Sequence, residues 1–98
     1  MKGVFAVGVA IAFPQLAMAT GMYQCEPVAQ GQWLPEASLT EMLEADGWRV
    51  RRMKVDGGCW EVYGTTPEGK RVEAYFHPAS GELLLLNQRG RIIFRSKD

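Results

Sequence analysis

The sequence predicts an α+β fold in which one α-helix packs against an antiparallel sheet of four to five strands. Residues 35–47 carry helix signals, and residues 48–95 form a succession of short segments with strand character. The turns between these segments are short, and short turns join antiparallel neighbours. One amphipathic helix on one face of such a sheet buries the apolar surfaces of both.

Residues 1–19 have the layout of a secretory signal peptide. Lys2 is the only early charge, residues 3–13 form an apolar run, Pro14 breaks it, and small residues surround a cleavage point before Thr20. An apolar run of about eleven residues is shorter than the roughly 20 that span a bilayer. We therefore expect export to the periplasm and no stable membrane insertion after the signal has been cleaved.

The two cysteines, Cys25 and Cys59, are predicted to form a structural disulfide. An even number of cysteines in a short exported chain indicates a disulfide framework, and this is the only intramolecular pair. Closing a loop of about 35 residues restricts the unfolded chain by roughly 3–4 kcal/mol. Residues 20–34 would then be an irregular arm tied to the folded domain, residues 35–98.

One helix is predicted within residues 35–47. Pro35 suits the first turn of a helix, whereas residues 38–41 (Ser-Leu-Thr-Glu) have the form of a capping box. The two signals differ by about one turn in where the helix starts. Gly47 stands where a left-handed residue would end it. Apolar residues at the spacing of one helix face are Leu39, Met42, Leu43 and Ala45.

The clearest strand signal is a β-hairpin over residues 58–81. Apolar and polar residues alternate along both of its arms, and residues 65–69 (Thr-Thr-Pro-Glu-Gly) have turn composition. One face would carry Trp60, Val62, Val72, Ala74 and Phe76. The other would carry Glu61, Tyr63, Arg71, Glu73 and Tyr75. Cys59 falls on the polar face, so the arm must cross that face or the sheet edge unless Gly57-Gly58 resets the phase.

The segment 48–55 is the first expected strand, although its apolar residues change phase halfway. A bulge at Arg51-Arg52 would bring four of them onto one face, namely Trp48, Val50, Met53 and Val55. Asp56-Gly57 follows as a short-hairpin signal.

Two further strands are expected at residues 82–86 and 91–95, joined by a turn at 87–90. Residues 83–86 are all leucine and leave no polar face. The run is buried between helix and arm in one interpretation. In the other it forms an exposed edge that accepts a strand from a partner.

Few groups suggest chemistry. His77 is the only histidine, whereas a zinc site takes three or four ligands and a nucleophile needs an adjacent base. Glu61 and Glu73 would lie on neighbouring strands, where a solvated, ion-paired face is the simplest interpretation. Their expected partners are Arg49, Arg51 and Arg71. No catalytic, cofactor-binding or metal site is therefore predicted, and we expect the protein not to be an enzyme.

The charge is balanced overall but unevenly distributed. The formal net charge is +0, and removing the leader takes away only Lys2, which leaves −1. Balance gives no general attraction to nucleic acid or anionic lipid. Basic residues nevertheless gather at 49–54, which is either a solvated strand face or a contact for an anionic partner. The candidate partner or anion contacts are Arg49, Arg51, Arg52 and His77.

Several segments occur together in one known family. They are a cysteine after a signal peptide, a Trp-x-Pro helix ending in Gly-Trp, a basic strand, and the stretches Gly-Cys-Trp-Glu-Val-Tyr-Gly, Arg-Val-Glu-Ala-Tyr and Pro-Ala-Ser-Gly-Glu-Leu. Over residues 33–86 the chain thus resembles the small exported PepSY-domain proteins of Gram-negative bacteria. The family's strand-ending turn usually reads Asp-Pro-x-Thr-Gly, whereas residues 77–81 read His-Pro-Ala-Ser-Gly, so an imidazole replaces a carboxylate.

The resemblance implies a PepSY-like fold and a non-enzymatic periplasmic module that binds another protein and modulates or inhibits an exported peptidase. The partner would be such a peptidase or a membrane protein, with no cofactor and no nucleic acid. The alternative is a small-ligand, anion- or metal-responsive periplasmic sensor or accessory protein that uses the basic strip and His77.

Overall fold

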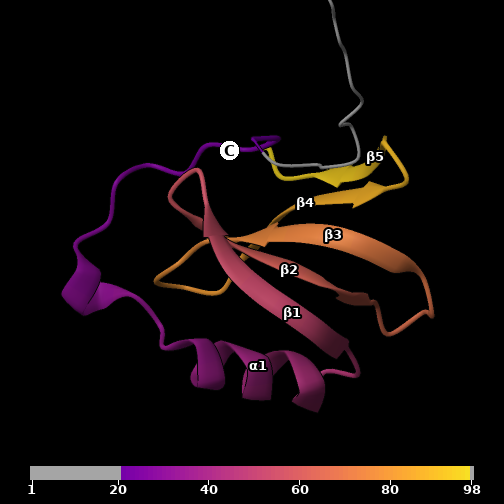
Figure 1. Ribbon diagram of the computed structural model, residues 1–98, viewed down its shortest axis with the longest axis horizontal. Coiled ribbons are helices and arrows are strands. Elements are labelled where there is room, and N and C mark those ends of the chain that lie inside the picture. The colour runs from indigo at the N-terminus through magenta and orange to yellow at the C-terminus, as the bar shows by residue number, and fades with distance from the viewer. Residues whose placement is uncertain (1–20, 98) are drawn as a thin grey trace, which may run out of the picture.

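The computed structural model, which describes residues 21–97, has one α-helix against one face of a five-stranded antiparallel sheet (Figure 1). The strand order is β1-β2-β3-β4-β5, so each strand pairs with its neighbours in sequence. The strands are β1 (Arg49–Asp56), β2 (Cys59–Thr65), β3 (Arg71–Phe76), β4 (Leu83–Gln88) and β5 (Arg91–Arg95). The predicted α+β architecture is therefore confirmed.

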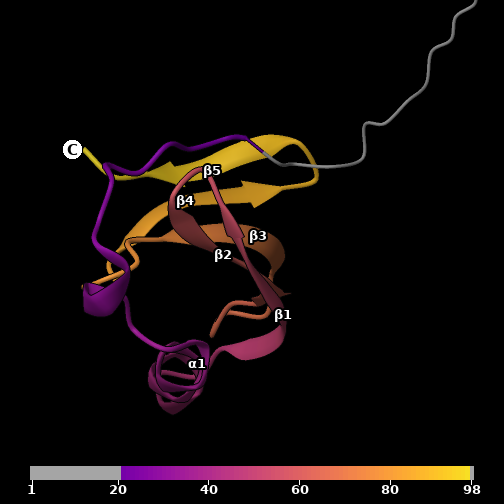
Figure 2. The ribbon, with the colours of Figure 1, turned by 60° about the vertical axis from the view of Figure 1, so that its left-hand side comes forward.

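The helix and the arm lie on opposite sides of the sheet (Figures 1 and 2). α1 (Glu36–Ala45) covers one face, residues 21–25 cross the other, and a short 3-10 turn, η3 (Gln30–Gln32), stands between them. We call the sheet surface away from α1 the arm face. The predicted signal peptide, residues 1–19, lies outside the described residues. Within residues 21–97, no helix is long and apolar enough to span a bilayer.

The helix begins directly after Pro35. The backbone of Pro35 is extended, and the N–H of Leu39 donates to its carbonyl oxygen at 3.1 Å. Ser38 therefore lies inside the helix, and the capping box predicted for residues 38–41 is wrong. The physical reason is that proline needs no N–H partner and has a fixed φ, so it can start the helix one turn earlier.

The helix ends as predicted, at Gly47. This glycine has a φ of 101°, a left-handed conformation that costs a residue without Cβ little. The N–H of Gly47 donates to the carbonyl oxygen of Glu44 at 3.1 Å, and that of Trp48 donates to Leu43 at 3.0 Å. This pair of bonds is the Schellman motif, and it turns the chain directly into β1.

The core between α1 and the sheet is built from alternate strand residues. Leu39 and Leu43 supply the helix side, whereas Met42, expected in the same stripe, is 43% exposed and Ala45 is also exposed. The sheet supplies Trp48, Met53, Val62, Val72, Ala74 and Phe76. The hairpin faces predicted from alternation are therefore correct.

A bulge in β1 keeps its apolar residues under the helix. The register of β1 and β2 shifts between Val50 and Arg52, which leaves Arg51 as the extra residue. Val50 and Met53 consequently both pack toward α1. Val55 falls in the same phase but is 56% exposed. The predicted bulge is confirmed.

The end of β4 was predicted two residues too early. β4 continues through Gln88, and the turn consists of Arg89 and Gly90, both with positive φ. The reason is a cross-strand contact, because the Asn87 side chain donates to Glu73 on β3 at 2.9 Å and holds this part of β4 in the sheet.

The leucine run of β4 lies between helix and arm. β4 is an interior strand, and β5 forms the sheet edge beyond it. Leu83 and Leu86 pack toward the α1 core, whereas Leu84 and Leu85 are buried on the arm face. An exposed edge at residues 83–86 is therefore wrong, and burial from both sides is correct.

The disulfide joins the arm to β2. Cys25 is bonded to Cys59 across 34 residues of sequence, which confirms the predicted pairing. The N–H of Cys25 also donates to Gly57 at 2.8 Å, in the two-glycine turn between β1 and β2. Gly57-Gly58 does not reset the strand phase, so the arm crosses the arm face.

Candidate functional site

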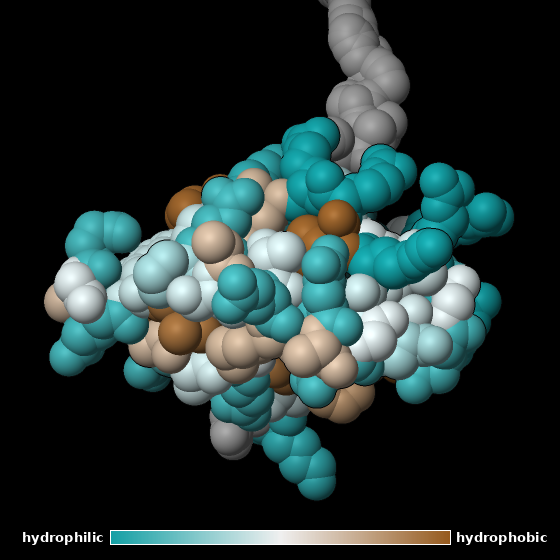
Figure 3. Space-filling model, turned by 90° about the horizontal axis from the view of Figure 1, so that it is seen from below, coloured by the Kyte–Doolittle hydropathy of each residue, from teal (hydrophilic) through white to brown (hydrophobic). Residues whose placement is uncertain are grey.

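The arm face consists of two halves, one covered by the arm and one left uncovered. The half under the arm, which we call the sealed half, contains buried sheet residues that pack with Cys25 of the arm: Cys59, Tyr75, Leu84 and Leu85. Beyond the arm, the strand ends near the β2–β3 and β4–β5 turns form a recess, which we call the open half. On the α1 side, hydrophobic atoms appear as small patches between hydrophilic ones (Figure 3).

Hydrogen bonds hold the arm onto the sealed half. The Tyr75 hydroxyl donates to Asp56 at 2.6 Å and accepts from the backbone N–H of Met22 at 3.2 Å. The N–H of Gly21 donates to the same Asp56 carboxylate at 2.6 Å. Burial first, and then the bond to Asp56, raises the pKa of Tyr75 above its ordinary value. These polar groups are therefore used internally, to fix the arm.

Glu61 lies on the arm face between the two halves and is fully buried. Its neighbours across the strands are Lys54 on β1 and Tyr75 on β3. The Lys54 ammonium is 3.9 Å from Oε1, and neither carboxylate oxygen has a hydrogen-bond partner among the described residues. Burial raises the pKa of Glu61 to about 7, although Lys54 opposes this effect. Such a carboxyl group titrates near neutral pH.

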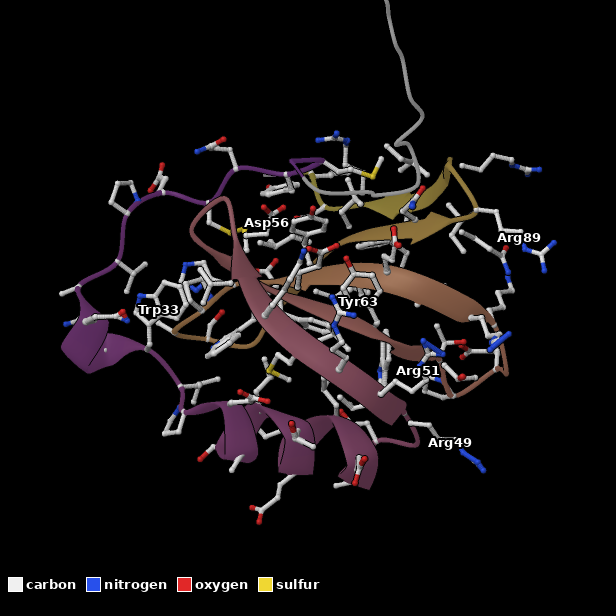
Figure 4. The ribbon with its side chains drawn as sticks, in the orientation of Figure 1. Trp33, Arg49, Arg51, Asp56, Tyr63 and Arg89 are labelled. Carbon is white, nitrogen blue, oxygen red and sulfur yellow. A yellow bond between two sulfur atoms is a disulfide. The ribbon has the colours of Figure 1, made fainter. Side chains whose placement is uncertain are left out.

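The open half contains a recess of about 300 Å³. Its lining comes from β1, β2, β3, β4 and the β4–β5 turn: Arg51, Tyr63, Gly64, Thr65, Arg71, Val72, Glu73, Asn87 and Arg89. Figure 4 shows Arg51 and Arg89 toward one end of the sheet, with Asp56 toward the other. We call this feature the arginine recess.

Local backbone structure brings the three arginines together. Arg51 is the extra residue of the β1 bulge, Arg71 begins β3, and Arg89 occupies the β4–β5 turn with a φ of 53°. Within residues 21–97, none of the three guanidinium groups has a carboxylate at ion-pair distance. The recess therefore holds three positive charges that have no ion-pair partner in the described part of the chain.

The predicted ion pairs on this face are not the ones that form. Glu61 pairs with Lys54, and Glu73 accepts from the Asn87 amide, instead of either carboxylate pairing with an arginine. The reason is register, because Lys54 stands directly opposite Glu61 and Asn87 directly opposite Glu73. Cross-strand neighbours of this kind interact most closely.

Asn87 adds an unused acceptor at the recess. It is 3% exposed, and its Oδ1 has no hydrogen-bond partner among the described residues. The amide orientation is set by Glu73, since the reversed amide would place two acceptor oxygens against each other. This oxygen can accept a hydrogen bond from a group that donates one.

The structure divides the basic strip. Arg51 lines the recess, whereas Arg52 lies over the Tyr63 ring with its guanidinium carbon 4.8 Å from the ring centroid. Arg49 is exposed at the start of β1 and points away from the sheet (Figure 4). The strip, for which a solvated strand face and an anionic contact were the two interpretations, is therefore split among separate environments.

His77 caps a turn in the β3–β4 loop. Its Nδ1 accepts from the backbone N–H groups of Ala79 and Ser80 at 3.1 and 3.2 Å, and Ser80 Oγ accepts from Glu82 at 3.1 Å. The imidazole thus performs the capping that a carboxylate could provide. The length of β3 separates His77 from Arg71 by about 20 Å, at roughly 3.3 Å per residue. His77 does not belong to the recess.

Two recess arginines were missed as contact residues in the sequence. Alternation in the sequence correctly placed Arg71 on the polar face, but Arg71 was expected to form an ion pair with Glu61 or Glu73. No sequence pattern indicated that Arg89 lines the recess, since its position depends on a turn and on the strand pairing. Among residues 21–97, no group of three or more His, Cys, Asp or Glu side chains could hold a metal ion.

Comparison with known proteins identifies one family. The family model described as peptidase propeptide and YPEB domain matches residues 3–85. The match includes the arm, α1, the first three strands and the beginning of β4. No curated protein and no solved structure gave a significant match.

Proposed function

The chain belongs to the PepSY family of peptidase propeptide and YPEB domains, and from this premise we propose that it is a non-enzymatic module that binds another protein. We further propose that it acts in the periplasm, where residues 1–19 would direct it. Its partner would be an exported peptidase, which it modulates or inhibits, or a membrane protein.

The arginine recess is the observation that supports this proposal. Arg51, Arg71 and Arg89 line one recess, and no carboxylate among the described residues lies within ion-pair distance of them. Arginine is common in protein interfaces, because its planar guanidinium forms paired hydrogen bonds with carboxylates and is more weakly hydrated than an ammonium group. A partner that supplies acidic groups would neutralise this surface.

The sealed half suits such a role because it makes the sheet rigid. The disulfide fixes the arm to β2, and Tyr75 and Asp56 fix its beginning. A binding surface on a pre-formed sheet loses less conformational entropy on association than one on a mobile loop. The arm would therefore support the recess without covering it.

Affinity capture from periplasmic extract tests the proposal. The secreted protein with a C-terminal tag is the bait, and the triple variant Arg51→Gln/Arg71→Gln/Arg89→Gln is compared with it. We expect one stoichiometric partner with the natural sequence and its loss with the triple variant. Arg49→Gln, which changes an exposed arginine outside the recess, should retain the partner. Recovery of no stoichiometric partner under several salt conditions would contradict the proposal.

A second candidate function is an anion-responsive sensor, which the same three arginines favour. Thermal unfolding with phosphate, citrate or divalent metals distinguishes the two functions. A small anion that raises the melting temperature, with an effect that disappears in Arg51→Gln, would favour the sensor. A sensor that also used His77 would need a separate second site, because β3 lies between His77 and the recess.

A further inference from the structure

We propose that the arginine recess binds a carboxylate carried on a peptide, together with a neighbouring peptide N–H group. The proposal rests on the proposed function in one respect, namely that the carrier of the carboxylate is a polypeptide. Its chemistry follows from three properties of the lining, which are its cations, its acceptors and its apolar rim.

The cations select a carboxylate. Arg51, Arg71 and Arg89 come from three different segments, so their guanidinium groups reach the recess from different directions. A guanidinium matches both oxygens of a carboxylate at once. The acid already present, Glu73, accepts from Asn87 and does not pair with the arginines. An incoming carboxylate would supply their missing partner.

The acceptors select a ligand that also donates hydrogen bonds. Asn87 Oδ1 is buried without a partner among the described residues, and the Glu73 carboxylate lines the same recess. A ligand with acceptor oxygens alone would meet repulsion from Glu73 and leave Asn87 Oδ1 unsatisfied, which costs free energy. A peptide carries an N–H group close to every carboxylate, whether that carboxylate is a side chain or the chain end. The mixed lining therefore favours a peptide over a free anion.

The size and the rim fit a short stretch of peptide. A volume of about 300 Å³ is at the lower end of ligand pockets, which suits a chain end or one acidic side chain. Ile92 on β5 stands opposite Asn87 in the sheet and is 45% exposed. Val72 lines the recess itself. The Ile92 side chain offers apolar contact to the residue beside the carboxylate, whereas the Val72 side chain packs in the core under α1.

Titration with four ligands tests the proposal and identifies the source of the carboxylate. The ligands are three N-acetylated tetrapeptides and acetate. The peptides are one of apolar residues with a free C-terminus, its C-terminal amide, and an amidated peptide with one internal Glu. Binding to the secreted protein is followed by calorimetry and by NMR shifts of the arginine Nε–H groups and the Asn87 amide. We expect at least one carboxylate-bearing peptide to bind about tenfold or more tightly than the uncharged amide.

The four ligands distinguish the possible outcomes. Binding of the free C-terminus alone identifies chain-end capture, and binding of the internal Glu peptide identifies side-chain capture; both support the proposal. Acetate binding as tightly as the peptides would overturn it, because the acceptors would then contribute nothing. Absence of saturable shifts with every peptide would also overturn it.

Variants tie the binding to the recess. Arg71→Gln and Arg89→Gln should each weaken the peptide about tenfold, because each removes a charge-assisted bond. Arg49→Gln should leave binding unchanged, and circular dichroism verifies that each variant is folded. Peptide binding that is unaffected by Arg71→Gln and Arg89→Gln would overturn the proposal.

The two proposals can fail separately. A captured partner that also binds the triple variant would leave the protein-binding function intact and remove the recess from it. Peptide binding without any captured partner would support the recess chemistry and contradict the proposed function.

Discussion

The two halves of the arm face come from the same strands, yet they use their polar groups in opposite ways. On the sealed half, Tyr75 and Asp56 bond to the arm and to each other. On the open half, Arg51, Arg71 and Arg89 have no internal partner in the part of the chain that the structure describes. Alternation in the strands provides polar side chains to the whole face. The course of the arm decides which of these side chains form hydrogen bonds within the protein and which stay accessible to a ligand.

Among the variants considered, loss of the disulfide should reduce the difference between the two halves most, because it frees the arm from the sealed half. The variant Cys25→Ala/Cys59→Ala removes a loop closure worth about 3–4 kcal/mol, and a core in a chain under about 80 residues rarely supplies more than ~3–5 kcal/mol. We expect the sealed half to open and the urea midpoint to fall steeply. Reduction of the natural protein is an independent control. An unchanged midpoint in both cases would show that the arm is held without the disulfide.

Glu61→Gln should change how stability depends on pH. Burial raises the pKa of Glu61 in the folded protein to about 7, from an ordinary value of 4.5. The folded state then binds more protons than the unfolded state between these two pH values, so this carboxyl group lowers stability as pH rises through the window. A pKa difference of one between the two states corresponds to about 1.4 kcal/mol of unfolding free energy.

We therefore expect Glu61→Gln to stabilise the protein by about 1–3 kcal/mol at pH 8 and to have little effect at pH 4. Urea unfolding at a series of pH values measures the difference between the two proteins. An equal difference at every pH would contradict a raised pKa for Glu61.

Tyr75→Phe should loosen the arm by a smaller amount. It removes the hydroxyl that donates to Asp56 and accepts from Met22, and we expect a loss of about 1–2 kcal/mol. Hydrogen exchange of the Met22 amide should accelerate, which shows the loss locally. If the unfolding free energy falls while the exchange at Met22 stays slow, the hydroxyl stabilises something other than the arm.

Arg71→Gln and Arg89→Gln should have the smallest effect on stability. Neither loses an ion pair within residues 21–97, so we expect the unfolding free energy to stay within about 0.5 kcal/mol of the natural protein. A loss greater than about 1 kcal/mol would mean that these arginines act internally, as the residues of the sealed half do. Urea unfolding of both variants checks this.

The sheet was largely predictable because its signals are local. The phases of the central hairpin follow from alternation, and the bulge at Arg51 follows from the phase change between Val50 and Met53. The disulfide followed from the number of cysteines and from the predicted export. Each of these conclusions needs only neighbouring residues or a count.

The recess was not predictable because it depends on contacts across strands. Residues 87–90 look like a turn, and only the pairing of Asn87 with Glu73 keeps Asn87 in β4. That pairing also determines where Arg89 lies. Similarly, Lys54 takes Glu61 as its partner by register, which leaves Arg51 and Arg71 without a carboxylate partner among residues 21–97.

The extra residue in β1 has one further consequence, which concerns insertions and deletions. Arg51 is the residue that the β1–β2 pairing skips, so a substitution there changes only a side chain. Deleting it would remove the skip and leave a regular ladder, in which Val50 still pairs with Gly64 and Arg52 with Tyr63, so each residue would keep its face of the strand. The strand could therefore lose this residue and keep its core, but it would lose one of the three arginines that line the recess.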